Sequence, residues 1–340
     1  MTKHRITMIF EDGRSEEIEA DEADTVYMAA LRNKIRLMTD CLEGACATCK
    51  GHVVSGEYSM DDYSDEAISD EEMRSRKVLT CQTHAKSDCV IEFPYDSKIA
   101  FKTPPRSWEC EVLSIENVSA NVVKLDLGIE GDADTRPSFM PGQYVNIGIP
   151  DAGQSRSYSF ANSPGARERL TFYIKILESG VMSDFLRCRA KEGDLVNIEG
   201  PFGHFYLRGQ ERPILMMAGG TGLAPMLSML DQMASMERFH KPVHLLYGVN
   251  YPDEFFGIRQ IESYSSKGVD LTYETISLNG SADLNGQSGH VTELLNEKLI
   301  QDNPEIYLCG PPPMIDAANA WLEKQGVDLN CVYSEKFLAS

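Results

Sequence analysis

Residues 40–50 read DCLEGACATCK, and one further cysteine follows at position 81 in the segment LTCQ. Three cysteines of the first segment, Cys41, Cys46 and Cys49, stand in C-x4-C-x2-C spacing, with Cys81 downstream. This spacing is typical of four thiolates that hold a [2Fe-2S] cluster. Gly44 and the small residues beside it allow a tight loop, whose backbone N–H groups can point at the cluster sulfurs. We therefore expect a one-electron carrier in this part of the chain.

Two other interpretations of these cysteines are four buried free thiols and a zinc site. Structural zinc sites usually combine two short-spaced pairs of ligands. Three of the four cysteines here share one small loop, and the fourth lies far downstream. The spacing therefore favours the cluster over zinc.

The chain has 340 residues, which predicts two or three domains. Its N-terminus runs into the acidic stretch EDGRSEEIEADEAD, unlike a signal peptide, and no window approaches the ~18 apolar residues of a membrane span. Nine cysteines without an export signal indicate a reducing cytoplasm. A net charge of -20 argues against nucleic acid and anionic membranes as partners, and leaves a basic protein partner open.

Part of this charge is concentrated in residues 57–72, which contain no basic residue. The acidic members are Glu57, Asp61, Asp62, Asp65, Glu66, Asp70, Glu71 and Glu72. Such a run is either a solvated surface or an electrostatic guide for docking an electron acceptor, and both interpretations stay open.

Residues 1–98 have the pattern of a small mixed domain. We expect strands at 5–10, 16–20, 51–55 and 89–93 and a helix at 26–36, with an Asp-Gly turn between the first two strands. This order, with the cluster loop after the helix, resembles the plant-type ferredoxins. The resemblance implies a β-grasp sheet that carries a [2Fe-2S] cluster at its edge. Residues 99–106 follow as a proline-containing linker.

Residues 107–208 predict an antiparallel β-barrel, because short strands are separated by Gly and Pro turns. The expected strands are 108–115, 122–127, 144–149, 156–160, 170–176 and 195–199. The string R-x-Y-S at 156–159 is short enough to occur by chance, but the string PGQY precedes it and G-x-x-S follows. In this order the three elements resemble the flavin site of the ferredoxin-NADP reductase superfamily.

The resemblance implies FAD and assigns its contacts. Arg156 would neutralise a flavin phosphate, Tyr158 would stack on the isoalloxazine, and Ser159 would offer a hydroxyl to flavin N5, with Ser157 in the same strand. A predicted helix at 183–189 begins in the G-x-x-S element, where free N–H groups would bind the pyrophosphate. The residues of that element are Gly180, Val181, Met182 and Ser183.

Residues 209–340 alternate between strands and helices, which predicts a parallel, doubly wound sheet that binds a nucleotide. Expected strands are 213–217, 243–247, 271–276 and 306–309, and expected helices are 226–236, 253–263, 290–298 and 314–324. The glycine loop departs from G-x-G-x-x-G, because a proline replaces the third glycine. It resembles the superfamily's G-G-T-G-x-x-P turn, here Gly219, Gly220, Thr221, Gly222 and Pro225.

Two further segments resemble the nicotinamide side of that superfamily. Cys309, Gly310 and Pro311 would lie beside the nicotinamide, with the thiol near the carbon that donates hydride. The segment YSEKF at 333–337 supplies Glu335 as a further candidate catalytic residue and Phe337 as a shield for the flavin face. Simple packing is the alternative role for both Cys309 and Phe337, and three residues follow Phe337 where the family's aromatic is terminal.

These three parts suggest one electron path. A nicotinamide gives up two electrons as hydride and a [2Fe-2S] cluster accepts one at a time, whereas a flavin can do both, so FAD belongs between them. NADH is favoured over NADPH, because acidic residues follow position 250 and Leu278 stands where NADPH-using relatives often place Arg. Arg259 is the nearest basic residue that would oppose this preference.

Over essentially all 340 residues the chain resembles the reductase components of two-component aromatic-ring dioxygenases, and most closely the benzoate 1,2-dioxygenase reductase group. The resemblance implies transfer of electrons from NADH through FAD and the cluster to a separate oxygenase component that acts on an aromatic acid. The same layout serves reductases of di-iron monooxygenases that oxidise phenols, methane or alkenes. A redox-sensing regulatory protein is a third possibility, although a sensor would not require a complete nicotinamide site.

Overall fold

The structure is a computed structural model that describes residues 2–101, 105–129, 136–164, 169–208, 211–237, 239–279 and 288–337. The chain forms two compact units. The first comprises Met1–Arg106 and Gly200–His204, and the second comprises Ser107–Glu199 and Phe205–Ser340. Residues 102–104 of the predicted linker and the last three residues of the predicted NADH domain lie outside the described residues.

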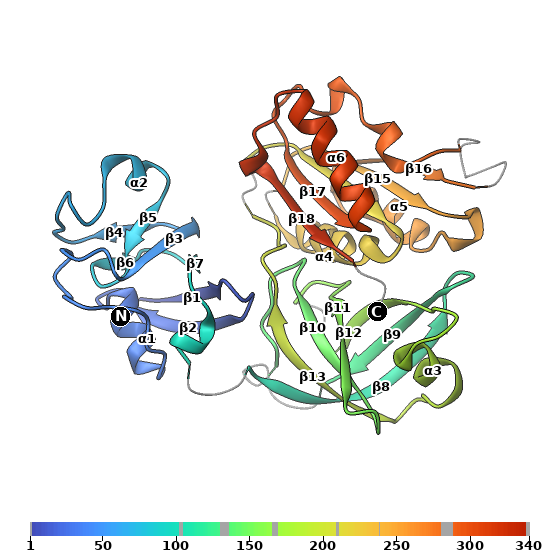
Figure 1. The fold of residues 1–340 in the computed structure, drawn as a ribbon, viewed down its shortest axis with the longest axis horizontal. Helices are drawn as coiled ribbons and strands as arrows, with labels where there is room; N and C mark the ends of the chain where they lie inside the picture. Colours follow the sequence, from blue (N-terminus) through green and yellow to red (C-terminus); the bar gives the residue numbers. More distant parts are fainter. Residues whose placement is uncertain are drawn as a thin grey trace. The chain divides into compact units, whose positions relative to one another are not determined.

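The first unit contains a five-stranded sheet of order β2-β1-β7-β3-β5 (Figure 1). Strands β1 and β7 are parallel, and the other neighbours are antiparallel. The strands are β1 Lys3–Phe10, β2 Ser15–Asp21, β3 Lys50–Ser55, β5 Lys77–Leu79 and β7 Cys89–Phe93, and a separate pair consists of β4 Tyr58–Met60 and β6 Thr83–Ala85. Apolar residues of β1 and β7 alternate into a core that helix α1 (Val26–Arg32) covers.

Helix α1 begins at its predicted residue, where the side chain of Thr25 accepts a hydrogen bond from the Met28 N–H. It ends at Arg32, so the predicted helix 26–36 was too long. The reason is a turn in which Lys34 adopts a φ of 64° and the Ile35 N–H donates to the Ala30 carbonyl. This turn directs the chain toward the cluster loop.

The acidic run is partly explained by helix α2 (Asp70–Arg74), which the sequence analysis did not predict. Ser69 and Glu72 form a reciprocal capping box, and acidic residues fill the first turn, where the helix dipole favours negative charge. Lys50 Nζ lies 2.7 and 2.8 Å from the two carboxylate oxygens of Glu72. This hydrogen bonding lowers the pKa of Glu72 to about 2. Glu72 therefore has a structural role.

The first half of the second unit, which we call the barrel, contains all six predicted strands in the order β11-β10-β13-β8-β9-β12 (Figure 1). They are β8 Ser107–Asn117, β9 Val122–Gly128, β10 Tyr144–Ile149, β11 Gln154–Ser159, β12 Arg169–Lys175 and β13 Leu195–Phe202, and helix α3 covers Val181–Cys188. Inward residues such as Leu127, Ile147 and Phe172 form its core.

The second half, the nucleotide part, is a parallel sheet of order β16-β15-β14-β17-β18. Its strands are β14 Ile214–Gly219, β15 Val243–Val249, β16 Leu271–Ser277, β17 Glu305–Gly310 and β18 Val332–Lys336, and its helices are α4 Leu223–Ser235, α5 Ile258–Ser266 and α6 Pro312–Lys324. Side chains alternate along β14: Met216 packs with α4 and α5, whereas Met217 packs with α6. Helices thus cover both faces of the sheet (Figure 1).

Three secondary-structure predictions in this part were wrong. The predicted helix 290–298 is two 3-10 helices, Val291–Leu294 and Glu297–Leu299, because the Asn296 side chain caps a new start. Helix α5 begins at Ile258, not at 253, since the 3-10 helix η4 (Pro252–Glu254) and the left-handed Gly257 precede it. Strand β18 was not predicted, although it carries Glu335 and leads into Phe337.

Candidate cofactor sites

The four predicted cluster cysteines lie together in the first unit. Cys49 Sγ is 3.3 Å from Cys81 Sγ, and the backbone N–H of Cys41 donates to Cys46 Sγ at 3.5 Å. Cys49 and Cys81 are buried, whereas Cys41 and Cys46 are partly exposed, and all four are free thiols. Cys49 and Cys81 thus bring their sulfurs together, and the backbone of Cys41 lies against the sulfur of Cys46, which places all four cysteines at one site. Among the described residues, no three His, Cys, Asp or Glu side chains are grouped as ligands of a single metal ion.

The backbone of the cluster loop is coiled by three left-handed residues, Leu42, Gly44 and Ala47, whose φ angles are 61°, 71° and 60°. This coil turns N–H groups inward, and those of Glu43 and Ala45 each lie 3.4 Å from Cys41 Sγ. Such donors stabilise negative charge on sulfur. The loop residues present thus fit an anionic iron–sulfur cluster.

The side chain of Gln82 holds the loop in place, and the cysteines of the site lie in different surroundings. Gln82 Nε2 donates to the Leu42 carbonyl at 3.0 Å and lies 3.6 Å from Cys81 Sγ. Hydrogen bonding by Thr48 lowers the pKa of Cys46 to about 6, while burial raises the pKa of Cys49 to about 11. At neutral pH the free Cys46 is therefore largely a thiolate, whereas Cys49 must lose its proton when it binds iron.

The flavin signature lies on β11, next to the strand that follows the PGQY turn. Ser157 Oγ donates to the Asn146 side chain at 2.7 Å across this strand pair. Among the described residues, Arg156 donates to local oxygens, the Ser155 carbonyl at 2.9 Å and the Gln154 side chain at 3.2 Å. Burial raises the pKa of Tyr158, so its phenol stays neutral. The Arg156 guanidinium is thus held beside the strand with donors that suit a phosphate.

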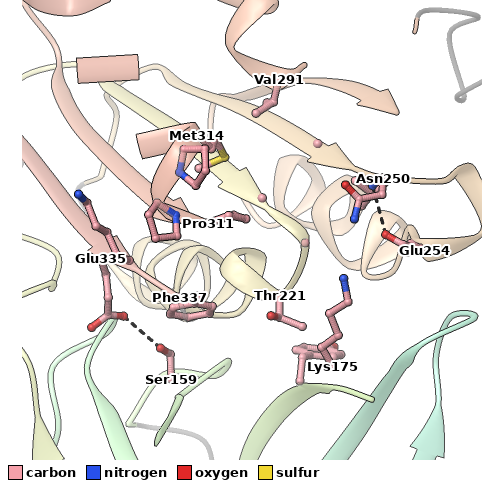
Figure 2. Close-up of a pocket in the computed structure, with 18 of the residues that line it drawn as sticks. Ser159, Lys175, Thr221, Asn250, Glu254, Val291, Pro311, Met314, Glu335 and Phe337 are labelled. Carbon is pink, nitrogen blue, oxygen red and sulfur yellow. Dashed lines mark hydrogen bonds between the residues drawn. The ribbon is translucent and has the colours of Figure 1, made fainter. Parts of the chain in front are cut away.

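A cavity of about 1150 Å³ lies between the barrel and the nucleotide part (Figure 2). This volume suits two large cofactors. The predicted site residues that line it are Arg156, Ser157, Tyr158, Ser159, Gly219, Gly220, Thr221, Pro311, Glu335 and Phe337. Figure 2 shows Ser159 and Phe337 from two distant parts of the chain facing the same space.

Other predicted residues lie behind the cavity wall. Cys309 is fully buried, and burial raises the pKa of its thiol well above the usual value. A Cβ on Gly222 would clash with the Cys309 carbonyl, and Gly310 packs on Gly219, so the two loops require their glycines. Pro225 lies buried in the first turn of α4, where its missing N–H costs little.

The predicted pyrophosphate element begins helix α3 and does not line the cavity directly. Gly180 is the N-cap of this helix, with Val181, Met182 and Ser183 in its first turn. Ser183 Oγ accepts a hydrogen bond from the N–H of Leu177 at 3.0 Å, and Leu177 lines the cavity. The element therefore supports the cavity wall through Leu177.

Strand β18 brings Glu335 to the cavity, and Phe337, which follows this strand, also lines it. Ser159 Oγ lies 3.3 Å from Glu335 Oε2, and burial raises the pKa of Glu335 to about 7, although the hydrogen bond to Ser159 lowers it. The Phe337 N–H donates to the Gly310 carbonyl at 2.9 Å, which holds the aromatic ring in the cavity wall. The nicotinamide loop and the C-terminal strand thus meet at one place.

Sequence reasoning missed several residues that line the same cavity. Lys175 ends β12, Asn250 and Glu254 follow β15, and His290 precedes Val291. For Asn250 and Glu254 the available signal was position, because residues at the carboxyl ends of parallel strands face the ligand crevice. No such signal marked Lys175, which ends an antiparallel strand, or His290. Arg259, the basic residue considered for NADPH, lies on α5 and does not line the cavity.

Three features together define an iron–sulfur flavoprotein reductase. They are the site of four cysteines, the barrel with its R-x-Y-S strand and the parallel nucleotide sheet. Comparison with known protein families agrees. A 2Fe-2S iron-sulfur cluster binding domain matches residues 9–86, an oxidoreductase FAD-binding domain matches 109–206, and an oxidoreductase NAD-binding domain matches 216–320. The cofactors are therefore a [2Fe-2S] cluster, FAD and NAD.

Relatives match over nearly the whole chain. Toluate 1,2-dioxygenase electron transfer component of Pseudomonas putida is 38% identical, with 99% of both chains covered, and anthranilate 1,2-dioxygenase electron transfer component of Acinetobacter baylyi is 38% identical, with 99% of this chain and 98% of the relative covered. Propane 2-monooxygenase reductase component of a Gordonia species is 34% identical, with 94% of both covered. The solved ferredoxin reductase of carbazole 1,9a-dioxygenase has a TM-score of 0.60 and 26% identity, covering 99% of this chain and 100% of that one.

The chain belongs to the family of dioxygenase electron transfer components. It is an oxidoreductase of the ferredoxin-reductase type, and the predicted fold class, with its β-grasp ferredoxin domain, flavin barrel and doubly wound nucleotide domain, is confirmed. In the described part of the chain, every helix is too short or too polar to cross a membrane.

Proposed function

We propose that this protein carries electrons from NADH through FAD and its [2Fe-2S] cluster to the oxygenase component of a dioxygenase that acts on a benzoate-type aromatic acid. The observation that supports this proposal most strongly is the 38% identity to two such electron transfer components over 99% of the chain. The nicotinamide supplies hydride, FAD converts two electrons into single electrons, and the cluster passes them on.

The chain's own contribution to the iron–sulfur site is charge stabilisation. Cys41, Cys46, Cys49 and Cys81 hold the cluster, and the inward N–H groups of the loop offset its negative charge. Because Cys41 and Cys46 are partly exposed, the cluster lies near the surface at that side of the loop. An electron acceptor can therefore approach the cluster from there.

The chain's contribution to the flavin site is binding and orientation. Arg156 pairs with a phosphate of FAD, Tyr158 packs on the ring system, and Ser159 presents its hydroxyl to the reacting face. The first turn of α3, Gly180 to Ser183, places free N–H groups for the pyrophosphate. The roles of Arg156, Tyr158 and Ser159 rest on the family likeness and on their place in the cavity wall, whereas the role of the α3 turn rests on the likeness alone.

The nicotinamide side is formed by two glycine-rich loops. Gly219, Gly220, Thr221 and Gly222 receive the NADH phosphates at the start of α4, followed by Pro225. Pro311 would lie beside the nicotinamide, with Cys309 and Gly310 behind it in the wall, and Phe337 would shield the flavin face. Glu335, which accepts a hydrogen bond from Ser159, lies at the edge of this site, where burial raises its pKa to about 7.

We infer a preference for NADH from the cavity wall beyond β15 and β16. Asn250, Glu254 and Leu278 line it, and none of these three is basic. A 2′-phosphate would require a cation there.

We further propose the domain boundaries 1–98, 99–106, 107–208 and 209–340. We also propose a cytoplasmic location, because all nine cysteines are free thiols.

The test is to mix the purified chain and NADH with two purified acceptors in parallel: the oxygenase component of an aromatic-acid dioxygenase and the hydroxylase of a di-iron monooxygenase. Each mixture also contains dioxygen and the organic substrate of its acceptor, an aromatic acid for the first. The proposal predicts that oxidised product appears with the first acceptor in step with NADH consumption. Product only with the second would establish the monooxygenase alternative, which the likeness to a propane 2-monooxygenase reductase keeps open. Failure to sustain NADH oxidation with ferricyanide would favour the redox sensor.

A further inference from the structure

A chain of hydrogen bonds joins the barrel to the nucleotide part at the rim of the cavity. Glu254, the last residue of η4, accepts a hydrogen bond from Asn121 Nδ2 at 2.7 Å through one carboxylate oxygen. Its other oxygen accepts the backbone N–H of Asn250 at 3.1 Å, the bond drawn in Figure 2. We call Asn121, Glu254 and Asn250 the rim clasp. Asn121 belongs to the barrel, and the other two belong to the nucleotide part.

The clasp is also tied to the cavity wall on its barrel side. The Asn121 carbonyl accepts the N–H of Ile176 at 2.7 Å, and Ile176 follows Lys175, which lines the cavity. The neighbouring Ala120 N–H donates to the Asp253 carbonyl at 3.0 Å. The turn before β9 therefore contacts both the end of β12 and η4.

On the nucleotide side the clasp reaches a second strand end. The Asn250 carbonyl accepts the N–H of Asn279 at 2.8 Å, and Leu278 beside it lines the cavity. A shift of Glu254 would thus move the loops after both β15 and β16. These are the loops that face a bound nucleotide in a parallel sheet.

A separate link between the two halves lies elsewhere on the cavity wall, where Ser159 meets Glu335 at 3.3 Å. Figure 2 shows this bond and the Asn250–Glu254 bond on opposite sides of the cavity. These two side-chain links involve residues that line the cavity on opposite sides, and they act together with further bonds between the halves, such as Ser163 N–H to Asp231 and Tyr173 to Gln260. Because hydride transfer needs reacting atoms held within a narrow range of distances, wall separation controls its rate.

We propose that Asn121 and Glu254 are positioning residues that hold the nucleotide part at the working distance from the flavin strand. The inference rests on the proposed function, which assigns the cavity to FAD and nicotinamide. The clasp acts through the cavity width, and Asn121 itself is not among the residues that line the cavity. Its bond to an ionised carboxylate is of the stronger, charge-assisted kind.

The test exchanges the donor and acceptor groups of the clasp in the full chain. Asn121→Asp places two carboxylates in contact. Glu254→Gln still allows a hydrogen bond between the two side chains, because the Asn121 amide can turn so that its oxygen accepts from the new amide nitrogen. In the double variant, the new side-chain amide at position 254 can donate through its nitrogen to the new carboxylate at position 121, while its oxygen still accepts from Asn250. Anaerobic stopped-flow measurement of flavin reduction by NADH yields the apparent Kd for NADH and the limiting rate for each variant.

We expect Asn121→Asp to raise the apparent Kd for NADH and to slow flavin reduction, with a combined effect of about tenfold or more. Glu254→Gln should be milder, and the double variant should recover most of the loss. Ser228→Ala is the matched control, since Ser228 Oγ donates to the Asn162 carbonyl at 2.8 Å between α4 and the barrel without lining the cavity. It should leave both constants unchanged.

Wild-type constants in Asn121→Asp, no recovery in the double variant, or an equal loss in Ser228→Ala would each overturn the proposal. If Asn121→Asp does not retain FAD, Asn121→Ala takes its place, and unchanged constants in that variant would also overturn it. An unaltered EPR signal after dithionite reduction shows that the cluster domain is intact. Absence of flavin reduction in the wild type would instead contradict the proposed function itself.

Discussion

Ser159 Oγ and Glu335 Oε2 lie 3.3 Å apart, although 176 positions separate the two residues in the sequence. The contact joins the flavin strand β11 to the edge strand β18 of the nucleotide part. Because Glu335 is withdrawn from water there, its carboxyl group holds a proton more strongly than it does in an unfolded chain.

The first prediction concerns this carboxyl group and pH. Burial raises the pKa of Glu335 from 4.5 to about 7, so between these values the folded protein binds a proton that the unfolded chain releases. The contribution of Glu335 to stability is therefore present at low pH and is lost as the pH rises through this window. Glu335→Gln should gain about 2 kcal/mol in unfolding free energy relative to wild type between pH 5 and pH 8.

Urea unfolding of both proteins at several pH values measures this difference. A difference between the two unfolding free energies that stays constant from pH 5 to pH 8 would show that Glu335 titrates normally. Ser159→Ala, which removes the bond that favours the charged form, should shift the transition to higher pH.

The second prediction concerns flavin affinity. In the part of the chain that the structure describes, Arg156 forms its hydrogen bonds with neutral oxygens of its own strand, which leaves its guanidinium charge available to a phosphate. Arg156→Ala should weaken FAD binding about tenfold or more, and Arg156→Lys should weaken it less. Fluorescence titration of the FAD-free chains measures this affinity, and equal affinity in all three proteins would remove Arg156 from the phosphate site.

The third prediction concerns the contact between the two glycine-rich loops. A Cβ at position 222 would clash with the backbone of Cys309, which is fully buried and unable to move aside. Gly222→Ala should therefore lower the free energy of unfolding by about 3 kcal/mol and weaken NADH binding. The control is Gly326→Ala, where the φ of 76° is strained but the space is open, and where we expect a loss of about 1 kcal/mol.

Calorimetry and NADH titration separate the two effects. Gly222 has an ordinary φ of −60°, so backbone strain does not contribute at that position. A loss of stability in Gly222→Ala no larger than that in Gly326→Ala would contradict the predicted clash with Cys309.

Local signals predicted much of this molecule. The cysteines of the cluster loop are close in sequence, apart from Cys81, and strand β7 was predicted with its observed bounds because its alternation is clear. The glycine loop was predicted from its resemblance to a known turn, and the structure supplies the physical reason, since a Cβ at position 222 would clash with Cys309. In each case a few neighbouring residues determine the local structure.

Contacts between distant segments could not be predicted in the same way. Strand β18 is short and mostly polar, and it is defined by its pairing with β17. The bond between Asn121 and Glu254 joins residues 133 positions apart, and each belongs to a turn whose composition is ordinary for a surface loop. The helix predicted at 290–298 had suitable spacing, but capping by His290 and Asn296 divides that segment into two short turns.

The most direct test of the electron path is anaerobic titration with NADH, followed by absorbance and by low-temperature EPR, on wild type, Cys46→Ser and Cys188→Ser. Cys188 is exposed at the end of α3 and serves as the matched cysteine control. We predict that NADH bleaches the flavin band in all three proteins, and that the EPR signal of a reduced [2Fe-2S] cluster appears in wild type and Cys188→Ser but not in Cys46→Ser. Flavin reduction in wild type without any cluster signal would contradict the account.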